Sequence, residues 1–284
     1  MEMTTYTTPK ERLTVAFFQQ DIAWEQPEAN HRMVEEAFSR LAQPADVLVV
    51  PETFATGFSD CMAAMAEPQE GATLQFARRM ARQHDSLFVG TWTVREKGQV
   101  VNRLHWVYPD GRYGWYDKAH TFRMSSEASQ LARGTRRVIF EWRGWRVKPA
   151  VCYDLRFPLW LRQTAPEGAC EGEEVRLGYD LMIVCANWPQ SRYEAWSTLL
   201  RARAIENLSY VVGVNRVGTD GVEIPYSGDS MAVDYKGHTL ASCAHGEASV
   251  AVATLDYETL RTFRSHWPFY LDFDRVAPEN MFCL

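Results

Sequence analysis

Hydrophobic and polar positions recur with two different periods along this chain. Short apolar runs that end in polar residues predict buried strands, whereas apolar residues three or four positions apart predict amphipathic helices. The predicted strands are residues 13–21, 46–50, 86–93, 137–142, 145–151, 180–186, 210–214, 230–234 and 249–255, and further strands are expected around the turns at 97–98 and 109–111. The predicted helices begin at Pro27, near Leu74, and at Pro158, Tyr193 and Tyr257. Helical and strand patterns therefore alternate through both halves of the chain.

Tight turns join several of these strands. Lys97-Gly98, Arg143-Gly144 and Lys236-Gly237 are typical turn sequences, as is the Pro-Asp-Gly at 109–111. Alternation of helices and strands favours parallel neighbours, and tight turns require antiparallel ones, so the sheets must be mixed and covered by helices. Two sheets packed together with helices outside satisfy this pattern. A single doubly wound sheet is the alternative.

The pattern gives no sign of a second domain. No repeat, low-complexity tract or linker divides the 284 residues, so residues 1–284 are predicted to form a single domain. We expect the first ten or so residues to be flexible. The acidic, glycine-rich insertion at 165–178 predicts a surface loop, although a lid or an altered subunit contact is an alternative. The aromatic tail from about residue 270 is expected to dock on the body or on a partner subunit.

Composition narrows the possible partners. The chain is 46% hydrophobic and 23% charged with a net charge of −6, which argues against nucleic acid as the main partner and favours a small molecule. Its six cysteines lack the spacing of zinc ligands, so no metal site is expected. No window approaches the length of a membrane span, and the first ten residues lack the apolar core of a secretory signal. We therefore expect a cytoplasmic protein with free thiols and no membrane partner.

Three reactive residues share one local context. Glu52, Lys118 and Cys152 each follow an apolar strand and lie beside aromatic residues. Taken singly, each has a plain structural interpretation: a solvated acid, a surface lysine and a small buried hydrophobe. Strand ends gathered at one edge of a sheet are, however, where α/β proteins build their sites.

The stretches around these residues resemble the nitrilase (carbon-nitrogen hydrolase) superfamily, whose enzymes use a Glu-Lys-Cys triad. They read PETFATGF at Glu52, YDKAHTF at Lys118 and VCYDLRFP at Cys152. Further matches follow in the family's order: Asn187-Trp188-Pro189, ARAIEN at 202–207, VNRVG at 214–218 and SGDSMAVD at 227–234. Within the superfamily the chain looks most like the ω-amidases, which hydrolyse the terminal amide of 2-oxoglutaramate and 2-oxosuccinamate. The resemblance implies an α-β-β-α four-layer sandwich with two mixed sheets, no cofactor, and a homodimer or higher homo-oligomer formed through the sheet-covering helices.

The same residues suit the chemistry of amide hydrolysis. An amide is a poor electrophile with a poor leaving group, so its hydrolysis needs a nucleophile, a proton carrier and a site for the oxyanion. Cys152 is the expected nucleophile, and Glu52 the group that removes its proton and later delivers it to the amine. Lys118 and the backbone N–H of Tyr153 would stabilise the oxyanion. The family's second glutamate corresponds best to Glu127, which could hold Lys118 or orient the substrate amide.

Other residues are candidates for the pocket. Phe58, Phe122 and Trp188 are expected to line it, although core packing is the alternative for Phe122 and Trp188. Arg156 could bind a substrate carboxylate, since a guanidinium suits that group, or pair with a neighbour as Asp154 is expected to do. His120 is a less favoured alternative base for Cys152.

These observations predict a cysteine-dependent hydrolase that releases ammonia from a small-molecule amide through a thioester. One alternative is another specificity of the superfamily, for a nitrile, an N-carbamoyl compound or a deaminated glutathione-like amide. A second is a non-catalytic binding protein on the same fold.

Overall fold

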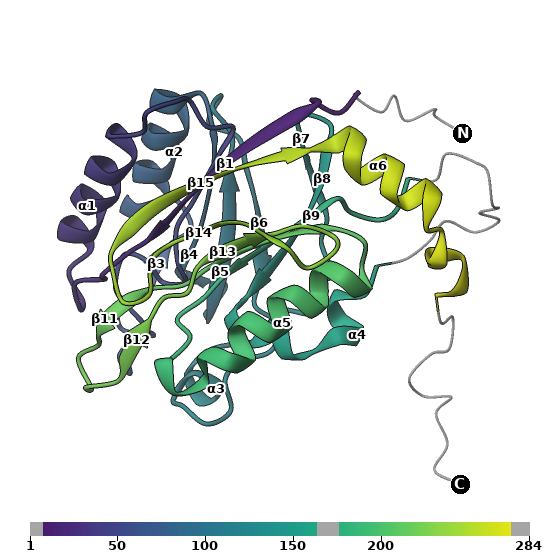
Figure 1. Ribbon diagram of the computed structural model, residues 1–284. Coiled ribbons are helices and arrows are strands. Elements are labelled where there is room, and N and C mark those ends of the chain that lie inside the picture. The colour runs from purple at the N-terminus through teal and green to yellow at the C-terminus, as the bar shows by residue number, and fades with distance from the viewer. Residues whose placement is uncertain (1–7, 164–175, 274–284) are drawn as a thin grey trace, which may run out of the picture.

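The computed structural model describes residues 8–163 and 176–273. In it, two large mixed β-sheets pack face to face between layers of helices (Figure 1). The first sheet has the order β15-β1-β2-β4-β5-β6, with β3 beside β4. Its strands are β1 (Arg12–Gln19), β2 (Val47–Val49), β3 (Glu67–Pro68), β4 (Leu87–Glu96), β5 (Gln99–Val107), β6 (Tyr113–Asp117) and β15 (Ser249–Asp256). The strands β1, β2 and β4 run parallel, and antiparallel pairs flank them.

The second sheet has the order β14-β13-β10-β9-β8-β7. Its strands are β7 (Phe140–Trp142), β8 (Trp145–Val151), β9 (Leu181–Cys185), β10 (Tyr210–Val214), β13 (Met231–Val233) and β14 (Thr239–Ser242). Here too the centre is parallel, through β8, β9 and β10, with antiparallel pairs at both edges. The short strands β11 (Val217–Thr219) and β12 (Pro225–Ser227) form a separate hairpin.

Alternation of side chains along the strands explains the layers. In β1, Leu13, Val15 and Phe17 point into the core between the sheets, while Ala16 and Phe18 point outward under the helices. Central strands buried on both faces read as nearly continuous apolar runs. The predicted α-β-β-α sandwich is therefore confirmed, and the alternative of a single doubly wound sheet is wrong.

Helices cover both outer faces. The helices α1 (Pro27–Ser39) and α2 (Ala72–His84) cover the first sheet, and α4 (Pro158–Leu161) and α5 (Tyr193–Glu206) cover the second (Figure 1). The last helix, α6 (Tyr257–His266), directly follows β15, and the Asp256 side chain caps it by accepting the backbone N–H of Thr259. The short 3₁₀ segments are Cys152–Arg156, Gln190–Arg192 and Phe269–Asp272.

Some elements differ from the sequence-based expectation. Residues 122–134 are polar and loop-like in sequence, but they contain the one-turn helix α3 (Glu127–Gln130). The strands β3, β11, β12 and β14 are not among the predicted strands, and each spans two to four residues. One turn cannot show a helical period, and three residues barely show a strand period.

The predictions about the termini and the insertion fall largely on residues 1–7, 164–175 and 274–284, which lie outside the described residues. At the N-terminal boundary, the backbone N–H of Lys10 donates to the carbonyl of Arg143 at 2.9 Å, and its ammonium pairs with Asp46 at 2.7 Å. At the other boundary, Tyr270 is buried against Leu177 and Leu208.

Candidate active site

Three strand ends from both sheets meet at one place. Glu52 follows β2 and Lys118 follows β6 of the first sheet, whereas Cys152 follows β8 of the second. A fourth strand end joins them: the backbone N–H of Asn187, just after β9, donates to Glu52 Oε2 at 2.8 Å. The Asn187 carbonyl lies 3.7 Å from Cys152 Sγ. The structure thus brings the predicted triad together across the seam between the sheets.

Two carboxylates hold the Lys118 ammonium. Its Nζ lies 2.8 Å from Glu52 Oε1 and 2.9 Å from both oxygens of Glu127. Asn102 Nδ2 donates to Glu52 Oε1 at 2.8 Å and to Glu127 Oε1 at 3.2 Å. The backbone N–H of Phe122 donates to Glu127 Oε2 at 2.6 Å. Two roles were expected for Glu127, to hold Lys118 or to orient the substrate amide, and these contacts support the first.

Burial sets the electrostatics of the site. Glu52 is fully buried, and desolvation, reinforced by the charge of Glu127, raises its pKa above the ordinary range even though Lys118 opposes the shift. Burial alone would lower the pKa of Lys118, but Glu127 and Glu52 outweigh it and raise the pKa above its ordinary value. Burial, followed by the Glu52 charge, raises the pKa of the Cys152 thiol. In the resting site the Cys152 thiol is therefore neutral, the Glu52 carboxyl group has a raised proton affinity, and Lys118 stays positively charged.

Local backbone geometry aims the nucleophile and the acid. Cys152 has φ of +43° and Thr53, next to Glu52, has φ of +42°, in the left-handed region that non-glycine residues rarely adopt. Such conformations persist where surrounding contacts enforce them. Beside Cys152, the buried Asp154 carboxylate accepts the backbone N–H of Val151 at 3.1 Å and the Tyr116 hydroxyl at 2.8 Å. The backbone N–H of Thr53 donates to Thr91 Oγ1 at 2.7 Å.

The same carboxylate accounts for His120. The backbone N–H of His120 and its ring Nδ1 lie 3.0 and 2.7 Å from Asp154 Oδ1, and the ring stacks on Phe157 with centroids 3.8 Å apart. These contacts are those of a residue that shapes the loop, and they leave Glu52 as the candidate base. Cys185 lies in β9 and is fully buried in the inter-sheet core.

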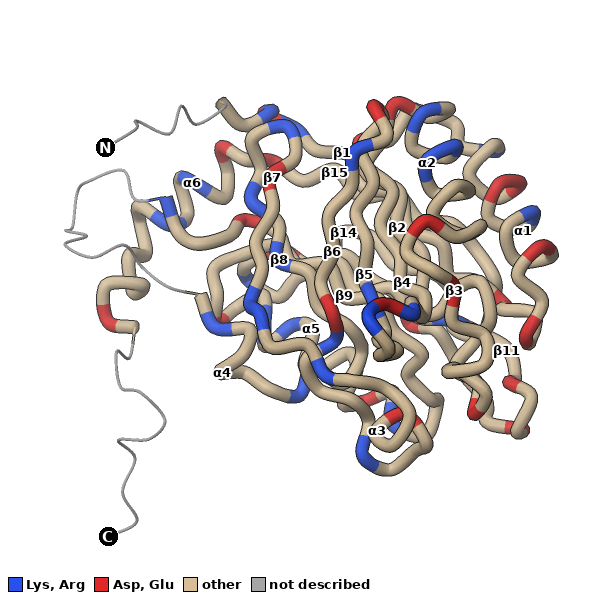
Figure 2. The backbone as a smooth tube through the Cα atoms, turned by 180° about the vertical axis from the view of Figure 1, so that it is seen from behind, with Lys and Arg blue, Asp and Glu red and all other residues tan. Residues whose placement is uncertain are grey.

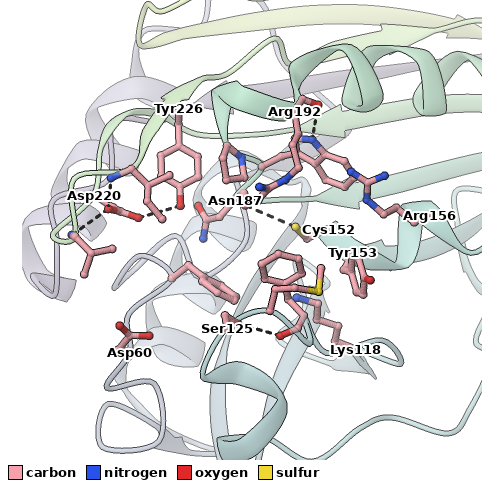
Figure 3. Close-up of a pocket in the computed structure, with 17 residues that line it drawn as sticks. Asp60, Lys118, Ser125, Cys152, Tyr153, Arg156, Asn187, Arg192, Asp220 and Tyr226 are labelled. Atoms are coloured by element: carbon pink, nitrogen blue, oxygen red, sulfur yellow. Dashed lines mark hydrogen bonds between the residues drawn. The ribbon is translucent and has the colours of Figure 1, made fainter.

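A pocket of about 260 Å³ opens above Cys152 (Figure 3). All the residues proposed from the sequence as substrate contacts line it, together with Lys118 and Tyr153; they are Phe58, Phe122, Arg156 and Trp188. The Arg156 guanidinium lies 4.7 Å from the centre of the Trp188 ring. Arg192, which also lines the pocket, lies 5.4 Å from the centre of the Phe122 ring. The pocket thus combines aromatic walls with the guanidinium groups of Arg156 and Arg192, the Lys118 ammonium, and the carboxylates of Asp60 and Asp220.

Several residues of the site were missed in the sequence. Asn187 carries a usable signal, since it directly follows a buried strand as Glu52 and Cys152 do. Asn102 carries no such signal. It lies inside β5, where a single polar residue is indistinguishable from the usual alternation of polar and apolar residues in a strand. Arg192 and Tyr226 reach the pocket from the start of the α5 segment and from β12, and only the fold shows their proximity (Figure 3).

Two other features are absent from the described residues. Within residues 8–163 and 176–273, no three or more His, Cys, Asp or Glu side chains are grouped so that they could hold a metal ion. No helix in these ranges is both long and apolar enough to cross a membrane.

Comparison with known proteins places this site in a family. Residues 14–265 match the model of the family described as "Carbon-nitrogen hydrolase". The chain is 39% identical to the "Omega-amidase YafV" of Yersinia enterocolitica over 93% of this chain and 97% of that protein. It is 29% identical to the "2-oxoglutaramate amidase" of Bacillus subtilis (strain 168), over 91% of this chain and 96% of that protein.

A solved structure gives the same picture. The protein XC1258 from Xanthomonas campestris, described as a CN-hydrolase superfamily protein with an arsenic adduct in its active site, is 37% identical. It superposes with a TM-score of 0.89 over 94% of this chain and 99% of its own. The family match, the similar proteins and the shared fold all indicate one family, and the chain belongs to the carbon-nitrogen hydrolase family.

Proposed function

We propose that this chain is an ω-amidase that hydrolyses the terminal amide of a small α-keto acid amide such as 2-oxoglutaramate or 2-oxosuccinamate. The observation that carries the proposal is the buried Lys118 ammonium, held by Glu52 and Glu127 beside the thiol that faces the pocket. The names of the relatives, omega-amidase and 2-oxoglutaramate amidase, support this substrate class.

The geometry suggests the order of bond changes. The Cys152 thiol gives its proton to Glu52 as Sγ bonds to the amide carbon, and the resulting oxyanion faces Lys118 and the backbone N–H of Tyr153. Glu52 then protonates the nitrogen, the C–N bond breaks and ammonia leaves a thioester on Cys152. Water attacks the thioester after losing a proton to Glu52, and the acid departs as the thiol re-forms. The raised pKa of Glu52 suits both proton transfers.

Replacement of Cys152 tests the chemistry. Cys152→Ala should abolish ammonia release from 2-oxoglutaramate, whereas Cys61→Ala, which changes an exposed thiol, should leave turnover unchanged. Mass spectrometry of the wild-type protein should detect a substrate-dependent acyl adduct on the peptide containing Cys152. Turnover by Cys152→Ala would contradict the mechanism, and a thioester formed only with nitriles or N-carbamoyl compounds would contradict the specificity.

Arg156 is the proposed contact for the substrate carboxylate. Its guanidinium lines the pocket and is positioned by Trp188, and a bidentate pair with a carboxylate is a strong charge-assisted interaction. Arg156→Met should raise KM for 2-oxoglutaramate by about 10–100-fold, since such bonds contribute about 1.5–3 kcal/mol. Uncharged amides should show no such change. An equal effect on charged and uncharged amides would rule out this role.

We further infer a homodimer in a cytoplasmic setting. Large apolar side chains are exposed on or beside the helices α4, α5 and α6, and they include Leu159, Ile205, Trp267 and Phe269. Such exposure supports contact with a second copy. Light scattering coupled to size-exclusion chromatography should give twice the chain mass, and cell fractionation should recover the protein with cytoplasmic markers. A monomer mass, or recovery in another fraction, would contradict the respective inference.

A further inference from the structure

A second cavity lies on the outer face of the second sheet. It encloses about 380 Å³ beside β8 and the end of α4, within the range of small-molecule sites. Its walls include Arg137, Lys148 and Arg162, with Gln163 and Tyr179. Figure 2 shows basic residues in this region, between β8 and α4. None of its lining residues also lines the catalytic pocket.

Lys148 occupies a position where the strand pattern calls for an apolar side chain. In β8, Val147 and Val151 point into the core between the sheets, so Lys148 points outward with Ala150. Ala150 and the cross-strand neighbour of Lys148, Met182, belong to the apolar layer under α5. The Lys148 residue is only 2% exposed. A charged group in such a layer requires a counter-charge or a ligand.

No such counter-charge contacts Lys148 in the described ranges of the chain. Among the described residues, its Nζ has no hydrogen bond or ion pair, although the side chain lines the cavity. Burial, and then the charge of Arg137, lowers the pKa of Lys148 to about 8, with Asp154 opposing the shift. The ammonium form still predominates at neutral pH. The cavity therefore contains a buried positive charge that forms no ion pair with a described acid.

The two arginines add donors. Arg137 Nη2 donates to the carbonyl of Arg162 at 2.7 Å, which engages one of its five N–H groups. The Arg162 guanidinium lies 4.4 Å from the centre of the Phe273 ring and keeps its edge for other partners. Among the described lining residues there is no Asp or Glu. Three cations thus border one cavity without a described acid.

The neutral walls are fixed by their own hydrogen bonds. Gln163 Nε2 donates to the carbonyls of Tyr179 and Asn207 at 2.8 and 3.0 Å, and Gln163 Oε1 accepts the Tyr179 N–H at 2.7 Å. The Tyr179 hydroxyl donates to the Leu161 carbonyl at 2.7 Å. These groups are satisfied within the protein, so the donors available to a ligand are those of the three cations.

We propose that this cavity binds a small oxyanion with at least two negative charges, either a phosphate group or a compact dicarboxylate. An ammonium and guanidinium groups around one space are the donors that recognise such oxygens. This site is separate from the catalytic pocket, and its existence does not depend on the proposed amidase activity. Its occupant would supply the counter-charge that Lys148 lacks.

Anion binding to the full-length protein tests the proposal. Isothermal titration calorimetry with inorganic phosphate, and separately with succinate, should give saturable binding in a background of potassium chloride at matched ionic strength. The midpoint temperature of thermal unfolding should rise as the concentration of the same ligand increases above its Kd. Lys148→Met keeps the volume of the side chain and removes its charge, so the affinity should fall by at least about tenfold.

A matched control separates this site from general surface charge. Arg82→Gln removes one positive charge from a different surface hollow, bordered by Arg78 and Arg79, and should bind the anion as the wild type does. Binding of phosphate alone or of succinate alone would support the site and identify the class of anion. The proposal would be overturned if neither anion bound saturably or if Lys148→Met bound it as tightly as the wild type. It would equally be overturned if Arg156→Met, rather than Lys148→Met, abolished the signal, since the anion would then lie in the catalytic pocket.

Discussion

Replacing Glu127 by glutamine is a strict test of how the site holds its positive charge. Both oxygens of Glu127 face donors only. Oε1 receives Lys118 Nζ and Asn102 Nδ2, while Oε2 receives Lys118 Nζ and the backbone N–H of Phe122. The amide group of glutamine must take one of these two places, so an NH₂ group would oppose two N–H donors in either orientation.

The loss in free energy of unfolding can be estimated from these contacts. Two hydrogen bonds disappear, at least one of them to the Lys118 ammonium, and bonds of this kind contribute about 1.5–3 kcal/mol each when a charged group takes part. Glu52 remains as a counter-charge, so the destabilisation should stay near 3–5 kcal/mol, as for a broken buried ion pair. The Glu127 charge also raises the pKa of Glu52, and its removal should lower that pKa and weaken Glu52 as the base that takes the proton of the Cys152 thiol.

The assay is amide turnover together with unfolding in urea. Glu127→Gln should lower kcat by about 10²–10³, comparable to the loss of one oxyanion donor, with a smaller change in KM. The acidic limb of the kcat profile should move to lower pH as the pKa of Glu52 falls. Ser129→Ala is a matched control on the same helix, because the hydroxyl of Ser129 bonds only to the nearby Ser126 carbonyl among the described contacts. A Glu127→Gln enzyme with kcat within tenfold of wild type and unchanged stability would refute the reasoning.

Two further predictions concern stability. Asp154→Asn should lose two of the four hydrogen bonds that Asp154 accepts, from Tyr116, Val151 and twice from His120, and lower the free energy of unfolding by about 2–4 kcal/mol. Urea unfolding measures this, and a loss below about 1 kcal/mol would show that the loop holds its shape without Asp154. The second concerns Lys148 in anion-free buffer. Its pKa of about 8 lies below the ordinary value of 10.5, so the unfolded chain binds more protons between these pH values and stability should rise with pH there. Below pH 8, Lys148→Met should be more stable than the wild type by about 3 kcal/mol, and the difference should vanish above pH 10.5. The groups around Lys148 that enter this comparison are Arg137, Arg162, Tyr179 and Asp154. A difference that does not change with pH would contradict it.

The sequence predicted the fold well where apolar runs are buried and turn residues mark their ends. Runs such as the one ending at Val151 are buried on both faces, and turn residues mark their ends. The hairpin of β7 and β8 was predicted around Arg143-Gly144, where both residues adopt positive φ. The missed elements are those too short for any period to appear, of which α3 is the clearest case.

The candidate site was predictable where polar residues directly follow apolar runs. Glu52, Lys118 and Cys152 satisfy this rule, and their shared context brought them together before any geometry was known. Asn102 does not satisfy it, because it stands inside a strand and its importance arises only from the approach of Glu52 and Glu127. The same limit applies to Lys148, since no local pattern shows whether a lysine in a buried strand has found a partner.

The seam between the two sheets has a mechanical consequence. Glu52 and Lys118 follow strands of one sheet and the thiol follows a strand of the other, so the spacing of acid and nucleophile depends on how the two sheets pack and on the Asn187–Glu52 hydrogen bond between them. Misplacement of reacting groups by about 1 Å can cost a hundredfold in rate. A small displacement of one sheet relative to the other should therefore lower the turnover rate before either sheet unfolds. The turnover rate is thus a sensitive measure of how tightly the two sheets are packed.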